Sequence, residues 1–181
     1  MKEKIRRESP FVRDIQGDSG LGCCWKEGLI FQDSEGNFLE IAKGDGINKA
    51  RLHHLHFDSR DLGASLNFYK NILSCTVIQQ EDGMAVVGLP NQCVILNKVN
   101  ELSEVTKTSY RGRHFAFTVS DDDFHAIVDK LHQAGIDERD DHGEREGRRP
   151  EQLGTYFKEP SGFRLQITNQ DSATFAQHAN E

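Results

Sequence analysis

The sequence lacks long hydrophobic runs and any excess of basic residues. No apolar stretch approaches the roughly 18 residues that a membrane-spanning helix requires, and the charged residues 1–8 contain no apolar segment typical of a secretion signal. Lysine and arginine total 22 against 29 aspartate and glutamate, which gives a formal charge of −7 and argues against a nucleic-acid-binding surface. We therefore expect a cytoplasmic protein that binds neither nucleic acid nor membranes.

Cysteine is also scarce, with four residues in a chain of 181. Cys23 and Cys24 are adjacent, Cys75 and Cys93 are isolated, and no CxxC pair is present, so neither a disulfide framework nor a zinc knuckle is indicated. Hydrophobic residues make up 36% of the chain, which is enough for one core. The length allows one domain, or two small modules that share a sheet.

The pattern that begins at residue 51 predicts a βαβββ unit over residues 51–99. Leu55 and Phe57 alternate with polar residues, which predicts a strand with one apolar and one polar face. A helix capped by Asp61 should follow. Three short strands broken by turn residues should complete the unit; we place them at residues 76–79, 84–89 and 93–97.

The same pattern restarts 60 positions later and predicts a second βαβββ unit over residues 110–168. His114 precedes Asp121 by the same spacing as His54 precedes Asp61, and a helix capped by Asp121 or Asp122 should end at Gly135. A strand from Ile136, a polar loop at 140–152 and a final hairpin should follow. We interpret this as an internal repeat and predict an α+β fold.

The flanking segments differ from the repeat. Residues 1–27 are polar and glycine-containing, and we expect a loosely ordered arm. Residues 28–46 contain a hairpin whose sequence at 30–41 aligns with 156–167, as if it were the end of an upstream module. The polar tail at 169–181 has no assigned role.

Polar faces of three predicted strands could together form a metal site. His54 and His114 occupy matching places in the repeat, and Gln166 offers an oxygen donor on the last strand. Two imidazoles and one oxygen match a facial site whose open positions bind substrate, water or O₂. Gln166 is a weaker ligand than a carboxylate. Each histidine could equally be an ordinary solvated residue.

Other polar residues on these faces are candidates for contact with a substrate. Tyr156 could donate a proton or hydrogen bond, although a core aromatic with a satisfied hydroxyl is the simpler interpretation. Arg164 could pair with an acidic substrate or with a surface carboxylate. The expected lining of the cavity is His56, Asp58, Thr118 and Arg164.

At these residues the chain resembles the vicinal oxygen chelate superfamily, which contains glyoxalases, fosfomycin and bleomycin resistance proteins and extradiol dioxygenases. The match covers about residues 51–168. The resemblance implies paired βαβββ modules whose eight strands, in mixed sheets, form a partial barrel around a divalent metal, commonly in a homodimer. It places the metal ligands at His54, His114 and Gln166, with Fe(II) or Mn as the expected ion.

The resemblance is nearest to the extradiol dioxygenases, in which a tyrosine precedes the third ligand by ten residues, as Tyr156 precedes Gln166. It therefore implies a metal-dependent enzyme that chelates vicinal oxygens of a small molecule. One alternative is a metal-free small-molecule binding or drug-resistance protein of the same fold, which Gln166 favours. Another is a degenerate module kept for assembly. Glu40, which aligns with Gln166, could also supply a carboxylate.

Overall fold

The computed structural model describes residues 2–9, 12–16, 27–33, 37–42, 52–89, 92–102, 114–138 and 153–170. The chain divides into two compact units, residues 1–52 and 53–181. Within the described ranges, no helix is both long enough and apolar enough to cross a bilayer.

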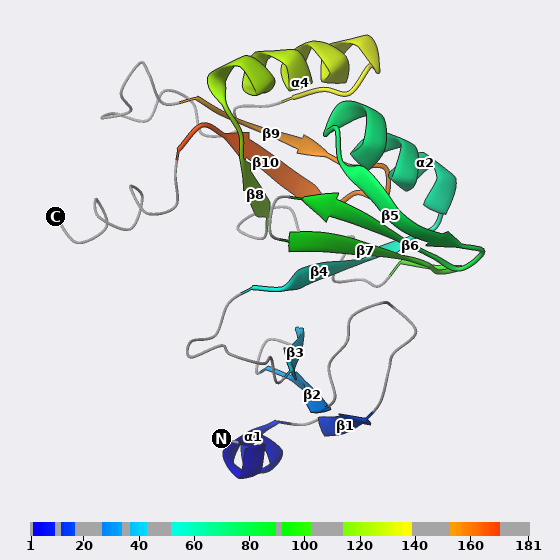
Figure 1. Cartoon of the computed structure of the whole chain (residues 1–181), viewed down its shortest axis with the longest axis vertical. Helices are drawn as coiled ribbons and strands as arrows, with labels where there is room; N and C mark the ends of the chain where they lie inside the picture. Colours follow the sequence, from blue (N-terminus) through cyan, green and yellow to red (C-terminus); the bar gives the residue numbers. More distant parts are fainter. Residues whose placement is uncertain are drawn as a thin grey trace, which may run out of the picture. The chain divides into compact units, whose positions relative to one another are not determined.

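The first unit contains a short helix and a three-stranded sheet. The elements are α1 (Lys2–Glu8), β1 (Val12–Gln16), β2 (Glu27–Gln32) and β3 (Phe38–Ala42). The strands are antiparallel in the order β1-β2-β3 (Figure 1). Since α1 and β1 lie within residues 1–27, this range contains more regular structure than the arm that the sequence predicted.

The first half of the second unit follows the predicted βαβββ pattern. A four-stranded sheet has the order β4-β7-β6-β5, with β4 parallel to β7 and the other pairs antiparallel. Asp61 caps the helix as predicted, because its Oδ1 accepts a hydrogen bond of 2.9 Å from the backbone N–H of Ala64. The elements are β4 (His54–Ser59), α2 (Leu62–Asn67), the π-helical segment η1 (Phe68–Ile72), β5 (Thr76–Glu81), β6 (Met84–Leu89) and β7 (Gln92–Lys98).

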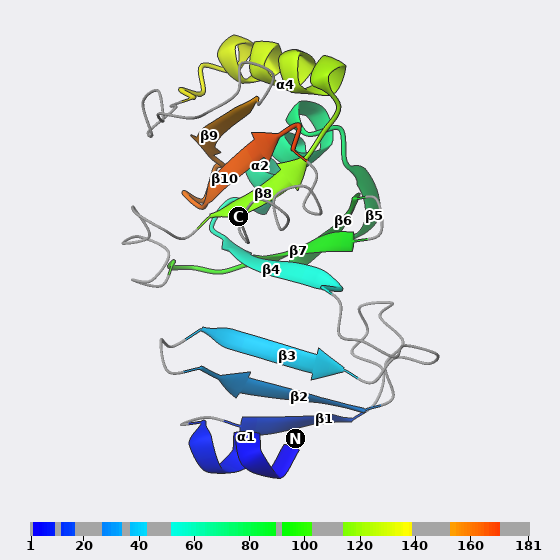
Figure 2. The same cartoon turned by 90° about the vertical axis from the view of Figure 1, so that its left-hand side faces the viewer.

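The second half forms a three-stranded sheet and a longer helix. Its elements are β8 (Phe115–Thr118), α4 (Asp121–Gln133), β9 (Gly154–Lys158) and β10 (Arg164–Thr168). The central strand β10 runs parallel to β8 and antiparallel to β9 (Figure 2). The α+β class with mixed sheets is thereby confirmed, whereas closure of eight strands into a partial barrel remains a prediction.

Two details of the second half differ from the sequence prediction. The cap of α4 is Ser120 rather than Asp121 or Asp122, because the Ser120 hydroxyl accepts a 3.1 Å hydrogen bond from the backbone N–H of Asp123. Gly135 ends the helix with a φ of +67°, as predicted. Residues 136–138 are not in a strand, and the predicted loop at 140–152 lies outside the described residues.

The hairpin of β2 and β3 repeats the geometry of the hairpin of β9 and β10. Ile30 pairs with Glu40 as Tyr156 pairs with Gln166. The register is therefore the same at every aligned position of the two hairpins, whereas the origin of the first hairpin in an upstream module remains a prediction.

The turns of the two hairpins are also bonded alike. The backbone N–H of Asp33 donates to the carbonyl of Asn37 over 2.9 Å, and the N–H of Asn37 donates to Asp33 Oδ1 over 2.8 Å. In the second hairpin the N–H of Glu159 donates to the carbonyl of Phe163 over 3.0 Å, and the N–H of Phe163 donates to Glu159 Oε1 over 3.1 Å. A carboxylate at the same turn position closes both turns.

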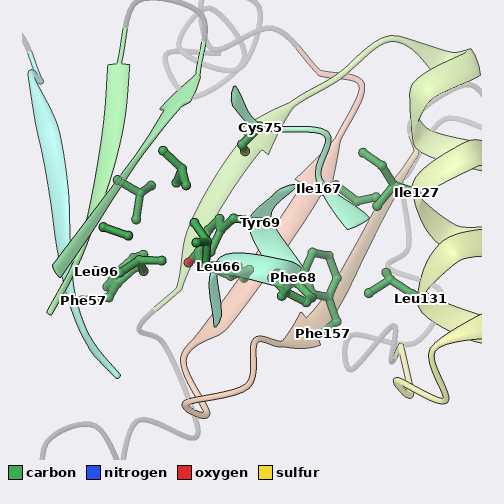
Figure 3. Close-up of a cluster of buried hydrophobic side chains, with 14 of the residues drawn as sticks. Phe57, Leu66, Phe68, Tyr69, Cys75, Leu96, Ile127, Leu131, Phe157 and Ile167 are labelled. Carbon is green, nitrogen blue, oxygen red and sulfur yellow. The ribbon is translucent and has the colours of Figure 1, made fainter. Parts of the chain in front are cut away.

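One hydrophobic core is shared by the two halves of the second unit. The ring of Phe68 in η1 lies 5.9 Å from that of Phe157 on β9, and the ring of Phe57 on β4 lies 4.6 Å from that of Phe163. Figure 3 shows Ile127 and Leu131 of α4 directed toward the rest of this cluster. Since both sheets contribute to the same core, the two halves fold around each other rather than as separate domains.

A buried polar cluster also joins the halves. The hydroxyl of Ser65 on α2 lies 2.8 Å from Ser59 Oγ and 3.2 Å from Ser161 Oγ, and it donates to Glu159 Oε2 over 3.3 Å. Glu159 is only 3% exposed. Burial raises the pKa of this carboxyl, and the hydrogen bonds from Ser161, Phe163, Ser65 and Gly162 partly oppose the rise.

Candidate functional site

The polar face of the β8-β10-β9 sheet gathers five of the predicted site residues. The register pairs Gln166 with Ala116 on one side and with Tyr156 on the other. Arg164 and His114 lie two residues from these positions along β10 and β8, so their side chains point to the same side of the sheet. We call the set His114, Thr118, Tyr156, Arg164 and Gln166 the β10 face.

Tyr156 is the centre of this face. The ring of His114 lies edge-on to it, with centroids 5.1 Å apart and an interplanar angle of 88°. The guanidinium carbon of Arg164 lies 4.3 Å from the centroid of the same ring. Tyr156 is buried, Arg164 and Gln166 are half-buried and His114 is exposed. The phenol ring is thus held by two cationic or potentially cationic neighbours on a face that solvent can reach.

A second polar group lies on β4 in the other sheet. His54, His56 and Asp58 alternate with Leu55 and Phe57, as the sequence predicts. The rings of His54 and His56 have centroids 6.4 Å apart. Asp58 is half-buried, whereas His56 is exposed.

The pKa of His54 is lowered from 6.5 to about 4. Burial of the ring is the largest cause, followed by the positive charges that His53 and His56 would carry. The Nδ1 atoms of His53 and His54 are 3.1 Å apart, an arrangement that two protonated rings could not keep. His54 is therefore neutral at neutral pH, and a neutral imidazole is the form that binds metal ions.

The two polar groups face away from the shared core. The rings of Phe57 on β4 and Phe115 on β8 meet on the apolar side. Because side chains alternate along a strand, His54 lies on the face of β4 opposite to Phe57, and His114 lies on the face of β8 opposite to Phe115. Within the described ranges, no cluster of three or more His, Cys, Asp and Glu side chains could hold a metal ion. The amide of Gln166 is not among these residue types, and use of His54, His114 and Gln166 by one ion belongs to the proposal below.

Sequence reasoning missed the buried cluster around Glu159 and the environment of the Tyr69 hydroxyl. Tyr69 is fully buried, and its hydroxyl makes no hydrogen bond to the described residues. Burial, with Glu159 and Cys75 nearby, raises the pKa of Tyr69. The sequence contains only a partial sign of this cluster: Ser59 and Ser65 interrupt faces that are otherwise apolar.

These observations define the class of protein: a repeated β-α-β pattern in mixed sheets, with imidazole and amide side chains on polar strand faces. Residues 51–167 match the Glyoxalase/Bleomycin resistance protein/Dioxygenase superfamily. The chain belongs to this superfamily.

Individual relatives include enzymes of different reactions. The chain is 27% identical over 124 residues to the metallothiol transferase FosB of Lysinibacillus sphaericus (strain C3-41), covering 64% of this chain and 79% of that protein. It is similar to the structure of oxidase ChaP-H2, with 26% identity, a TM-score of 0.53 and coverage of 67% of this chain and 94% of that one. The fosfomycin resistance protein FosX of Listeria monocytogenes, 15% identical with a TM-score of 0.57 over 72% of this chain and 98% of that one, shares the fold.

Proposed function

We propose that this chain is a metal-dependent enzyme that binds vicinal oxygens of a small molecule, with His54, His114 and Gln166 as the metal ligands. The observation that carries the proposal is the β10 face, where Gln166 pairs with Tyr156 and the Tyr156 ring contacts His114. We further propose that the protein acts as a homodimer, as is common in the superfamily.

The donor set fits a divalent ion of intermediate hardness. Two imidazole nitrogens and one amide oxygen suit Fe(II) or Mn, and three ligands leave positions open. Lowering of the His54 pKa favours the neutral ring that such an ion needs. When bound, the metal would hold two substrate oxygens and polarise them as a Lewis acid.

The remaining residues of the site would bind and orient the substrate. The Tyr156 hydroxyl would donate a hydrogen bond to a substrate oxygen, and its ring is already fixed between His114 and Arg164. A donor held in place before binding loses little entropy when the complex forms. We propose His56, Asp58 and Thr118 as further lining of the cavity.

We propose oxidative ring cleavage of a dihydroxyaromatic compound by O₂ as the reaction, in which both oxygen atoms of O₂ enter the ring-opened product. The ten-residue interval between Tyr156 and Gln166 supports it, as does the 26% identity to oxidase ChaP-H2. The second candidate is metal-free binding of a small molecule. Gln166 favours this alternative, because a neutral amide does not balance the charge of a divalent ion as a carboxylate would.

Metal content separates these candidates. Protein purified anaerobically without an affinity tag should contain near-stoichiometric iron or manganese by elemental mass spectrometry. The double substitution His54→Ala/His114→Ala should abolish this content, whereas His125→Ala, on the exposed face of α4, should not.

Activity and chelation complete the test. The metal-loaded protein should produce ring-cleavage absorbance with a catechol, and a chelator should lower its melting temperature. If no metal is found and none is taken up from added Fe(II), the enzyme proposal fails. Ligand-dependent stabilisation that is indifferent to chelator would then favour metal-free binding.

A further inference from the structure

We infer that Arg164, stacked on Tyr156, forms an anion-binding subsite on the β10 face, so that the substrate is a small acid with a carboxylate or another oxyanion group. The inference rests on the function proposed above, because it assigns a substrate class to the same site. Nothing in the superfamily match requires a charged substrate.

The position of Arg164 on its strand supports this assignment. Arg164 precedes Gln166 by two residues on β10, and the register places both side chains on the same side as Tyr156. Two residues of a strand span about 7 Å. This backbone spacing is similar to the length of a catechol ring that carries a short acidic side chain. One small molecule could therefore reach Gln166 and Arg164 together.

The stacking on Tyr156 prepares the guanidinium for an anion. The guanidinium carbon lies 4.3 Å from the ring centroid, so one flat face of the group is covered. The N–H donors of arginine lie in the plane of the guanidinium, at its edge, and this edge matches the two oxygens of a carboxylate or phosphonate. Because Tyr156 is buried, the ring is a fixed support.

The charge of this side of the sheet also favours an anion. The residues that share it on the three strands are His114, Ala116, Thr118, Gly154, Tyr156, Lys158, Arg164, Gln166 and Thr168. Two carry a permanent positive charge and none is acidic, although the chain as a whole has a formal charge of −7. A locally positive face on an acidic protein attracts small anions. No carboxylate among the residues of this face repels them.

A matched pair of probes tests the subsite. The probes are 3-(3,4-dihydroxyphenyl)propanoate and its primary amide, which has nearly the same shape but no charge. Titration calorimetry should show that the wild-type protein binds the acid roughly 10- to 100-fold more tightly than the amide, the range expected for a hydrogen-bonded charge pair. Arg164→Gln should lose this preference, and Arg164→Lys should keep part of it.

Lys158→Gln is the matched control, because Lys158 lies beside Arg164 on the paired strand and its loss changes the net charge equally. It should lose much less of the preference for the acid than Arg164→Gln does. Equal binding of acid and amide by the wild type would overturn the inference, as would equal loss of preference in the Arg164→Gln and Lys158→Gln variants. Arg164→Lys, which retains charge and stacking volume, serves if Arg164→Gln does not fold.

The same titrations with and without added Mn(II) separate the two proposals. The neutral amide has no charge for Arg164 to bind, so tighter binding of the amide on adding Mn(II) would report on the metal site alone. If the amide is insensitive to Mn(II) but the preference for the acid persists, the metal proposal fails and the anion subsite stands. If the amide responds to Mn(II) but no preference for the acid exists, only the subsite fails.

Discussion

Ser65 and Glu159, 94 residues apart in the sequence, are joined by a buried hydrogen bond between Oγ and Oε2. The corresponding turn of the first unit shows why this contact exists. There Asn37 donates from its side-chain Nδ2 to Asp33 Oδ2 over 2.8 Å, so the aspartate is satisfied within its own hairpin. Phe163 stands where Asn37 would be, and the longer Glu159 reaches α2 instead. The contact fixes the hairpin that carries Tyr156 and Gln166 against the first half.

Removing the hydroxyl of Ser65 should destabilise the protein. Ser65→Ala leaves Glu159, Ser59 and Ser161 with an unfilled partner in a buried cluster, which costs about 1–3 kcal/mol. Urea denaturation followed by fluorescence measures this loss. Thr76→Val, which removes an exposed hydroxyl from β5, should change the free energy of unfolding by less than about 0.5 kcal/mol. A loss as small for Ser65→Ala as for Thr76→Val would show that the cluster does not join the halves.

Glu159 should make stability depend on pH in a definite direction. Its folded pKa lies above the ordinary 4.5, so the folded state binds a proton more tightly than the unfolded state. The stability from this group is therefore complete below about pH 4.5 and is lost as pH rises through the folded pKa. The neutral variant Glu159→Gln should lack this decline.

Denaturant titrations of both proteins from about pH 4.5 to about pH 8 measure the difference. The gap in free energy of unfolding between wild type and Glu159→Gln should change steadily in favour of the variant as pH rises. Glu101→Gln, which removes an exposed carboxylate, should give a curve parallel to that of the wild type. A pH-independent gap for Glu159→Gln would contradict the raised pKa.

The shared core should respond to truncation far more than the surface. Ile167 on β10 is fully buried, whereas Ile78 on β5 is 61% exposed. Ile167→Ala should cost about 2–5 kcal/mol, and the same change at Ile78 should cost less than about 1 kcal/mol, the span of strand propensity. Equilibrium unfolding of the two variants under the same conditions provides the comparison, and similar losses would disprove a core centred on β10.

The turn after α4 should tolerate only glycine. Gly135 has a φ of +67°, and no atom lies within 4 Å of the position that a Cβ would occupy. A side chain there would therefore strain the backbone without clashing with a neighbour. Gly135→Ala should lower the free energy of unfolding by about 1–2 kcal/mol. Gly83→Ala, also in open space but without a positive φ, should be neutral or stabilise by about 0.4–1 kcal/mol. Thermal melts of both variants would show whether the signs differ.

Periodicity of residue type made most of the second unit predictable. The alternation around Phe57 placed β4, and the restart of the same pattern 60 positions later placed the second half. The predicted cap of α4 was wrong, because Ser120 and Asp121 are both good capping residues and only the backbone conformation decides between them. Residues 1–27 gave no periodic signal, so α1 and β1 were not expected.

The candidate site was predictable as a face but not as a set of contacts. Strand alternation was enough to place Arg164 and Gln166 on one side of β10 and Tyr156 on the same side of the paired strand β9. The stacking of Arg164 on Tyr156 depends on side-chain conformation, which no spacing in the sequence reveals. The bond from Ser65 to Glu159 depends on how the two halves pack, and residues so distant in the chain carry no local signature of their contact.

The duplicated hairpin has a consequence for handling the protein. Among the described strands β3 pairs only with β2, and Phe38, Leu39 and Ile41 are 63%, 45% and 37% exposed. Leu165 and Ile167 of β10, the counterparts of Leu39 and Ile41, are fully buried, and β10 has a neighbour on each edge. An uncovered apolar edge strand is a template for aggregation. Concentrated solutions of this chain should therefore self-associate through β3, and a lysine in place of Leu39 should improve its solubility.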